Sequence, residues 1–154
     1  MRTIKFRGKN GLDKWVYGSL VSGQSDNGTD VCFIAESLPV GTDDFEHWNL
    51  PMQRVKPETV GQYIGRNDCN STPIYEGDII TVNGKYPKLV RYIDEWHSFC
   101  VANLDAITDP CMSRWPDVCN YQQPSPNWWN DFKREIKVIA NAHDNPELVK
   151  AKEV

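Results

Sequence analysis

Apolar and polar residues alternate with a period of two in several short segments, which is the pattern of a half-buried β-strand. At the N-terminus, residues 2–7 place Ile4 and Phe6 on one face and the polar residues Thr3, Lys5 and Arg7 on the other. A turn pair, Asn10-Gly11, follows, and residues 15–21 then alternate again with Trp15, Tyr17 and Ser19 opposite Val16, Gly18 and Leu20. The sequence therefore predicts a β-hairpin at the start of the chain.

Further strands are predicted along the rest of the chain from short apolar runs between turn residues. Asn83-Gly84 is the strongest hairpin signal, and Gly77 can adopt the positive φ that turns the chain into a strand. These strands cover residues 31–35, 59–64, 74–82, 89–93, 99–102 and 135–140. The expected class is mainly β.

Two segments interrupt this pattern. Residues 38–52 contain prolines, glycine and aspartates without a period and are predicted to form an irregular loop. Residues 103–130 are rich in proline and tryptophan, which predicts an ordered insertion without regular elements. Only the tail after Pro146 favours a helical turn, since proline suits the first helical position. We expect a single domain over residues 1–154.

Composition narrows the class of protein. The chain has 154 residues, of which 40% are hydrophobic and 25% charged, as is typical of a globular domain. The formal net charge of -4 gives no overall attraction to nucleic acid, so such a role needs a local basic patch. No apolar stretch approaches the length of a membrane span, and five irregularly spaced cysteines favour free thiols in a reducing, cytoplasmic compartment.

Four segments together resemble the YopX family of phage and prophage proteins: residues 4–7, 60–65, 74–80 and 138–148. The motif residues within them are Tyr63, Tyr75, Glu76, Gly77, Asp78, Asp144, Asn145 and Pro146. The resemblance implies a core similar to a small SH3-like β-barrel, in a cytoplasmic protein of the bacterial host. It supplies no established activity and no catalytic residues.

The chain departs from the family pattern at three places. Residues 69–73 replace a turn in which the family usually has glycine, and Ala140 stands where the family tends to have glycine in the closing strand. The insertion rich in tryptophan and proline has no counterpart that we can name. The local geometry at these places is therefore not implied by the resemblance.

The acidic motif residues allow two interpretations. Glu76 and Asp78 could bind a divalent cation, or act with His143 in a hydrolase if the three line one pocket. The structural alternative, which we favour, is that both carboxylates accept hydrogen bonds from backbone amides in the turn before the next strand. Likewise, Asp144-Asn145-Pro146 is typical of a helix entry, with Asn145 as the cap.

The sequence predicts neither a metal nor a cofactor. Cys111 and Cys119 are eight positions apart, and His47, His97 and His143 are scattered along the chain. No glycine-rich phosphate-binding loop is present. We therefore expect no zinc site, no nucleotide site and no nucleophile in a recognisable frame.

Two surfaces remain as candidates for binding. The basic residues Lys85, Lys88 and Arg91, with Tyr86 and Tyr92 between them, could follow a nucleic-acid backbone, although a solvated strand face explains them as well. Three tryptophans of the insertion, Trp115, Trp128 and Trp129, could form a protein interface or fold back into the molecule. The leading hypothesis is a non-enzymatic phage accessory protein that forms a homo-oligomer through these tryptophans.

Overall fold

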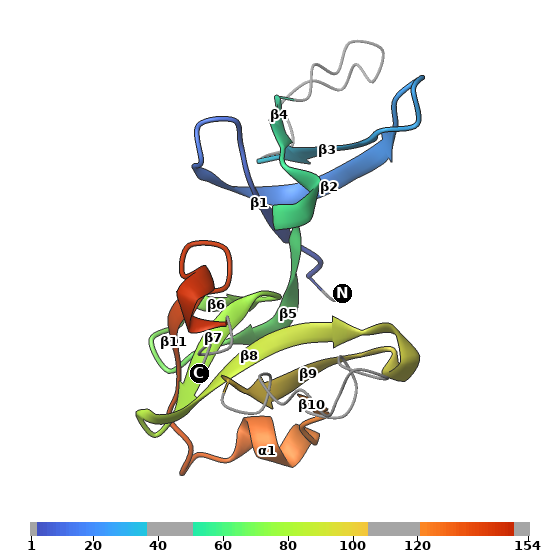
Figure 1. Cartoon of the computed structure of the whole chain (residues 1–154). Helices are drawn as coiled ribbons and strands as arrows, with labels where there is room; N and C mark the ends of the chain where they lie inside the picture. Colours follow the sequence, from blue (N-terminus) through green and yellow to red (C-terminus); the bar gives the residue numbers. More distant parts are fainter. Residues whose placement is uncertain (1–2, 37–50, 105–120, 150–154) are drawn as a thin grey trace, which may run out of the picture. The chain divides into compact units, whose positions relative to one another are not determined.

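The computed structural model describes residues 3–36, 51–104 and 121–149. The chain forms two compact units, Met1–Gly65 and Arg66–Val154. The strands are β1 (Phe6–Lys9), β2 (Trp15–Gln24), β3 (Asp30–Ala35), β4 (Met52–Val55), β5 (Gly61–Asn67), β6 (Pro73–Tyr75), β7 (Asp78–Val82), β8 (Lys85–Ile93), β9 (Ser98–Asn103), β10 (Tyr121–Gln122) and β11 (Ile136–Asn141), as Figure 1 shows. The helical elements are the 3₁₀ turns η2 (Pro57–Thr59), η3 (Asp94–Trp96) and η6 (Pro146–Leu148) and the short helix α1 (Pro126–Asn130).

The mainly β class is confirmed, whereas the closed barrel is not. The described strands form two antiparallel sheets, in the orders β4-β3-β2-β1-β5-β6 and β10-β9-β8-β7-β11. Each order runs from one edge strand to another, so neither sheet closes on itself. The SH3-like barrel expected from the resemblance is thus corrected to two open sheets, and the single domain stays a prediction.

Strand β2 organises the first unit because it changes partners along its length. Its first part pairs with β1, from Lys9↔Trp15 to Phe6↔Gly18, and its second part pairs with β3, beginning at Ser19↔Ala35. A Cβ at Gly18 would lie 1.9 Å from the backbone oxygen of Ala35, so only glycine fits where the partners change. The core on one face of this sheet consists of Val16, Cys32, Ile34 and Val55, with Phe6, Leu20 and Val60 packed against it.

The first strand and the strand β4 differ from the prediction. Strand β1 begins only at Phe6 because β2 provides partners for residues 6–9 alone, and Ile4 remains 58% exposed. Strand β4 was not predicted, because Val55 is its only buried residue and it pairs with β3 without an apolar alternation. It includes Met52, which the prediction assigned to the loop at 38–52; residues 37–50 lie outside the described part of the chain.

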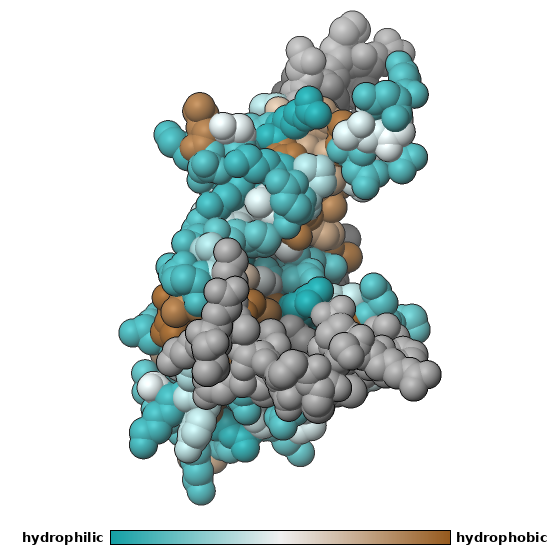
Figure 2. Space-filling model, viewed as in Figure 1, coloured by the Kyte–Doolittle hydropathy of each residue, from teal (hydrophilic) through white to brown (hydrophobic). Residues whose placement is uncertain are grey.

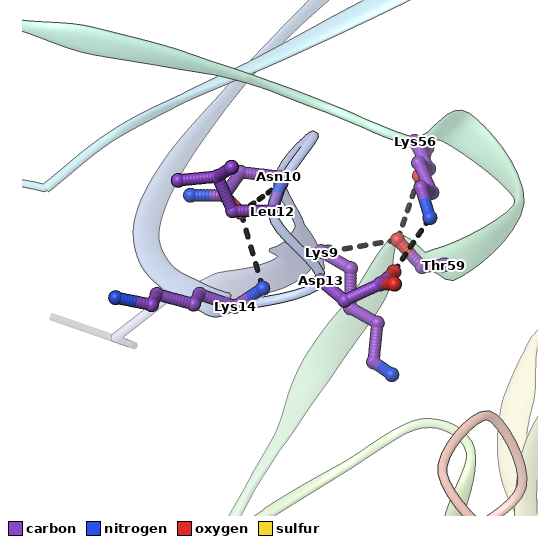
Figure 3. Close-up of polar contacts among 7 residues, drawn as sticks. All are labelled: Lys9, Asn10, Leu12, Asp13, Lys14, Lys56 and Thr59. Carbon is purple, nitrogen blue, oxygen red and sulfur yellow. Dashed lines mark hydrogen bonds and ion pairs between the residues drawn. The ribbon is translucent and has the colours of Figure 1, made fainter.

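The turn between β1 and β2 is held from two sides (Figure 3). Asn10 Oδ1 accepts hydrogen bonds from the backbone nitrogens of Leu12 and Lys14, at 3.0 and 3.1 Å. Lys56 Nζ contacts Asp13 Oδ1 at 2.6 Å. Thr59 Oγ1 accepts from Lys9 N at 2.8 Å and donates to Lys56 O at 2.7 Å. The end of β1 is therefore fixed to η2 as well as to its own hairpin.

The second unit follows the prediction more closely. Strands β7 and β8 are joined by Asn83 and Gly84, whose φ values of 53° and 68° fit the tight hairpin turn expected for this pair. Strand β11 pairs with β7, with an irregularity between Val138 and Ala140. Buried residues of this unit include Ile74, Ile79, Ile80, Leu89, Val90, Cys100 and Val101.

The described end of the insertion contains regular structure, which corrects the expectation that only the tail is helical. Strand β10 pairs with β9, and α1 follows it. Ser125 Oγ accepts a hydrogen bond from Trp128 N, and Pro126 occupies the first turn, so a local start signal outweighs the proline content. The tail forms η6, as the predicted helical turn requires. No helix in the described residues is long and apolar enough to cross a membrane.

Candidate functional site

The acidic motif residues hold the turn between β6 and β7. Gly77 has a φ of 83°, and Asp78 Oδ2 accepts a hydrogen bond from Tyr75 N at 2.8 Å. Glu76 Oε1 accepts from Tyr92 N of β8 at 3.2 Å. Asp78 thus binds a backbone amide of the turn, as the sequence favoured, whereas the amide that Glu76 binds belongs to β8 and not to the turn.

The second motif segment lies directly against this turn. Ala142 N donates to Gly77 O at 2.8 Å, and Asn141 is the register partner of Asp78. Asn141 Oδ1 accepts from the backbone nitrogens of His143 and Asp144, and its Nδ2 donates to Asp144 Oδ2 at 2.6 Å. Two motifs far apart in sequence therefore form two adjacent turns, one at the start of β7 and the other at the end of β11.

The details of these two turns bear on the remaining motif residues. Asn145 precedes Pro146 at the start of η6, but its side chain makes no capping bond and lies near Glu147 instead. His143 is exposed, whereas Asp78 is buried. No group of three or more His, Cys, Asp or Glu side chains among the described residues could hold a metal ion. The hydrolase stays a prediction.

The motif residue Tyr63 belongs to β5, where its backbone nitrogen donates to Lys5 O at 2.8 Å.

Asp68 is a structural residue that the sequence analysis did not single out. Its Oδ1 accepts hydrogen bonds from Asn70 N and Thr72 N at 2.8 and 2.9 Å, and its Oδ2 accepts from Val138 N of β11 at 3.1 Å. Burial raises the pKa of Asp68, but the hydrogen bonds from Thr72, Val138 and Asn70 outweigh it, so the net shift is downward. The sequence signal that could have indicated this role is the high density of turn-forming side chains in residues 67–71.

The basic candidates on β8 do not share one face. Lys88 and Arg91 are three positions apart in one strand, so their side chains project to opposite sides of the sheet. Lys88 is half-buried, its Nζ contacts Asn103 Oδ1, and burial lowers the pKa of its ammonium group. Lys85 and Tyr86 are exposed at the hairpin end, and Tyr92 stacks edge-on against Phe99 with centroids 5.1 Å apart. Nucleic-acid binding by these residues stays a prediction.

The tryptophans of α1 form a partly exposed cluster with arginines of the same unit. Trp128 and Trp129 are half-buried, with ring centroids 4.9 Å apart and nearly perpendicular planes. Arg134 Cζ lies 5.4 Å from the Trp128 ring and its Nη1 donates to Trp128 O at 3.1 Å. Arg66 Cζ lies 5.9 Å from the Trp129 ring, and its Nη1 donates to Asn130 Oδ1 at 2.6 Å. Cation–π contacts of this kind hold both rings in place.

The next residue with an aromatic ring is exposed almost completely. Phe132 has a relative exposure of 92%. On the face drawn in Figure 2, hydrophobic residues form small areas separated by hydrophilic ones, as is usual for a protein surface. We call Trp128, Trp129 and Phe132 the aromatic surface. Trp115, the third tryptophan predicted for an interface, lies outside the described residues.

Comparison with known proteins identifies the family and supports the fold. The family model described as YopX protein matches residues 5–150. The crystal structure of protein EF1440 from Enterococcus faecalis is similar, with a TM-score of 0.54 and 19% sequence identity over 97% of this chain and 100% of that chain. At this identity the likeness concerns the fold alone. The search of curated proteins gave no match.

Proposed function

The chain belongs to the YopX family, and from this membership we propose a phage- or prophage-derived accessory protein that acts by binding, with copies of the chain associating through the aromatic surface. It works in the cytoplasm, where Cys32, Cys69 and Cys100, which are free thiols, stay reduced.

The observation that carries this proposal is the exposure of Phe132, which follows the anchored Trp129 by three positions in the chain. Burial of a phenylalanine side chain stabilises a protein or a complex by roughly 1.5–3 kcal/mol, and the fold of one chain does not bury this ring. Tryptophan and arginine are also the residues that dominate binding energy in protein interfaces. Because Trp128 and Trp129 are already held by Arg134 and Arg66, little side-chain entropy is lost on association.

Charge favours a second copy as the occupant of this surface. Each ring has one cation near it: Arg134 at Trp128, Arg66 at Trp129 and Lys133 at Phe132. Asp131 pairs with Arg134 at 3.6 Å. In a symmetric pair of copies, the Asp131 carboxylate of one copy can meet the cations of the other, so this surface carries both signs of charge that such a contact needs.

The test is the molar mass of the protein in solution, measured by light scattering coupled to size exclusion over a range of concentrations. We expect the intact chain to be an oligomer and Phe132→Ser to shift it toward the monomer, since a ring that is 92% exposed contributes little to the fold of one chain. Leu12→Ser is the matched control, because Leu12 is also exposed, at 78%, and lies outside the aromatic surface.

The far-ultraviolet circular dichroism of all three proteins is expected to be the same. A monomeric intact chain at every concentration would contradict assembly. Equal dissociation by Phe132→Ser and Leu12→Ser would contradict the assignment of the contact to the aromatic surface.

A further inference from the structure

The register of β1 and β2 brings basic and aromatic side chains to one face of the first sheet. Arg7 lies directly opposite Tyr17, and Lys9 directly opposite Trp15. Side chains of directly opposite residues in an antiparallel pair project to the same side. The four residues therefore form a two-by-two block on the sheet face opposite the core residue Val16.

The same face continues across β3 and β4. Val21 of β2 lies opposite Phe33, and Phe33 lies opposite Arg54 of β4. The core residues Ile34 and Val55 alternate with Phe33 and Arg54 and face the other side. One face of this sheet is thus the core, and the other carries a row of apolar, aromatic and basic side chains. We call the second one the basic face.

Charge is segregated between the two faces of these four strands. Arg7, Lys9 and Arg54 are the basic residues of β1–β4, and all of them have register positions on the basic face. Asp30, the acidic residue of these strands, has the opposite alternation and accepts a hydrogen bond from Gln24. The face is therefore locally cationic in a chain whose net charge is -4.

Two cations of the basic face contact the Trp15 ring, and one of them, Arg7, is buried. Arg7 Cζ lies 4.6 Å and Lys9 Nζ 5.4 Å from the centroid of the Trp15 ring. The backbone of Lys9 is fixed by the hydrogen bond from its nitrogen to Thr59 Oγ1, which Figure 3 shows. Within this block, Tyr17 is 47% exposed. Arg7, Lys9 and Trp15 are therefore preorganised by their contacts, and the Tyr17 ring is accessible to a ligand.

We propose that the basic face binds single-stranded nucleic acid. Lys9 and Arg54 would contact phosphates, and unpaired bases would stack on the Tyr17 ring and against the edge of the Trp15 ring. A duplex buries the faces of its bases and so cannot use the rings, and an acidic peptide would satisfy the cations alone. Only a single strand matches both chemistries of this face. DNA and RNA share them, and the experiment separates the two.

The experiment measures fluorescence anisotropy of labelled short oligonucleotides, single-stranded DNA, single-stranded RNA and a DNA duplex, with the full-length chain. We expect the single strands to bind more tightly than the duplex. The logarithm of the binding constant should fall linearly with the logarithm of the salt concentration between about 50 and about 200 mM. Tighter binding of RNA than of DNA would mean that the face also contacts the 2′-hydroxyl of the ribose. Equal affinities would mean that the face binds only through base stacking and phosphate contacts.

Variants locate the site. Tyr17→Ala is expected to weaken binding by about fivefold to about 150-fold, whereas Tyr17→Phe, which keeps the ring, retains it. Arg54→Ala is expected to weaken binding and to reduce the slope with salt by about 0.7. Lys14→Ala is the matched control for charge, because Lys14 is exposed in the hairpin turn outside the basic face.

Lys85→Ala and Tyr86→Ala test the competing surface on β8, where both residues are exposed. Binding that these two variants abolish and that Tyr17→Ala and Arg54→Ala leave unchanged would overturn the proposal. No anisotropy change with either single strand at about 50 mM salt would overturn it as well. Thermal unfolding of each variant separates lost binding from lost folding.

Discussion

Gly18→Ala is expected to lower the free energy of unfolding of the first unit by about 4 kcal/mol or more, or to prevent this unit from folding. The added Cβ would lie 1.9 Å from Ala35 O and 2.7 Å from Ala35 C, and both atoms belong to backbone. A flexible side chain could move aside, but the carbonyl of Ala35 is fixed by the pairing of β3 with β2. Either that pairing or the pairing with β1 must therefore open.

Urea unfolding followed by tryptophan fluorescence measures this effect, with Gly23→Ala as the control. Gly23 lies in the same strand, and no other heavy atom is within 4 Å of the place that its Cβ would take. We expect Gly23→Ala to unfold at nearly the urea concentration of the unchanged chain. Similar losses for the two variants would mean that the glycine content of β2, and not the close approach at Gly18, limits stability.

Asp68→Ala is expected to lower the free energy of unfolding of the second unit by about 3 kcal/mol. The variant removes the acceptor for three backbone amides, of Asn70, Thr72 and Val138, at a residue that is only 8% exposed. Asp26→Ala is the control, since Asp26 is exposed in the turn between β2 and β3. Equal effects of the two variants would contradict the role of the buried carboxylate.

The contribution of Asp68 depends on pH. Because its pKa in the folded chain is below the ordinary value of 3.8, the carboxylate stabilises the fold above that pH, and this stabilisation is lost as the pH falls through the lower folded pKa. The difference in stability between the unchanged chain and Asp68→Asn should therefore be constant near neutral pH and shrink in strongly acidic solution. A difference that grows below about pH 4 would reverse the sign of the pKa shift.

Features decided by neighbours in sequence were predicted from the sequence. The hairpin at Asn83-Gly84 and the turn at Gly77 depend on backbone conformations that these residues adopt at little cost, and the structure has both. Asp78 was interpreted as an acceptor for a backbone amide of this turn, as it is, whereas Glu76 accepts from an amide of β8 instead. Strand β4 was missed because it forms by pairing with β3. The residues Met52–Val55 themselves show no apolar alternation that would indicate a strand.

The residues that make up the basic face could not be predicted from the local sequence pattern. The alternation separated Arg7 from Phe6 and Trp15 from Val16, but it could not say that Arg7 and Trp15 share a side. That follows only from the register, which a shift of one residue would reverse. The closed barrel failed for a related reason, since closure depends on how the edge strands meet and not on the strands themselves.

The hydrogen bonds around Asp68 also bear on self-association of the sheet. Strand β11 is the last strand in its sheet, and an edge strand offers unpaired backbone groups to other chains. Here Val138 N is taken by Asp68 Oδ2 and Ile136 O accepts from Cys69 N at 2.8 Å, so one side chain and one turn occupy the place of a further strand. The Asp68 carboxylate therefore protects this edge against aggregation, and a chain without it would expose a strand ready to pair with its neighbour.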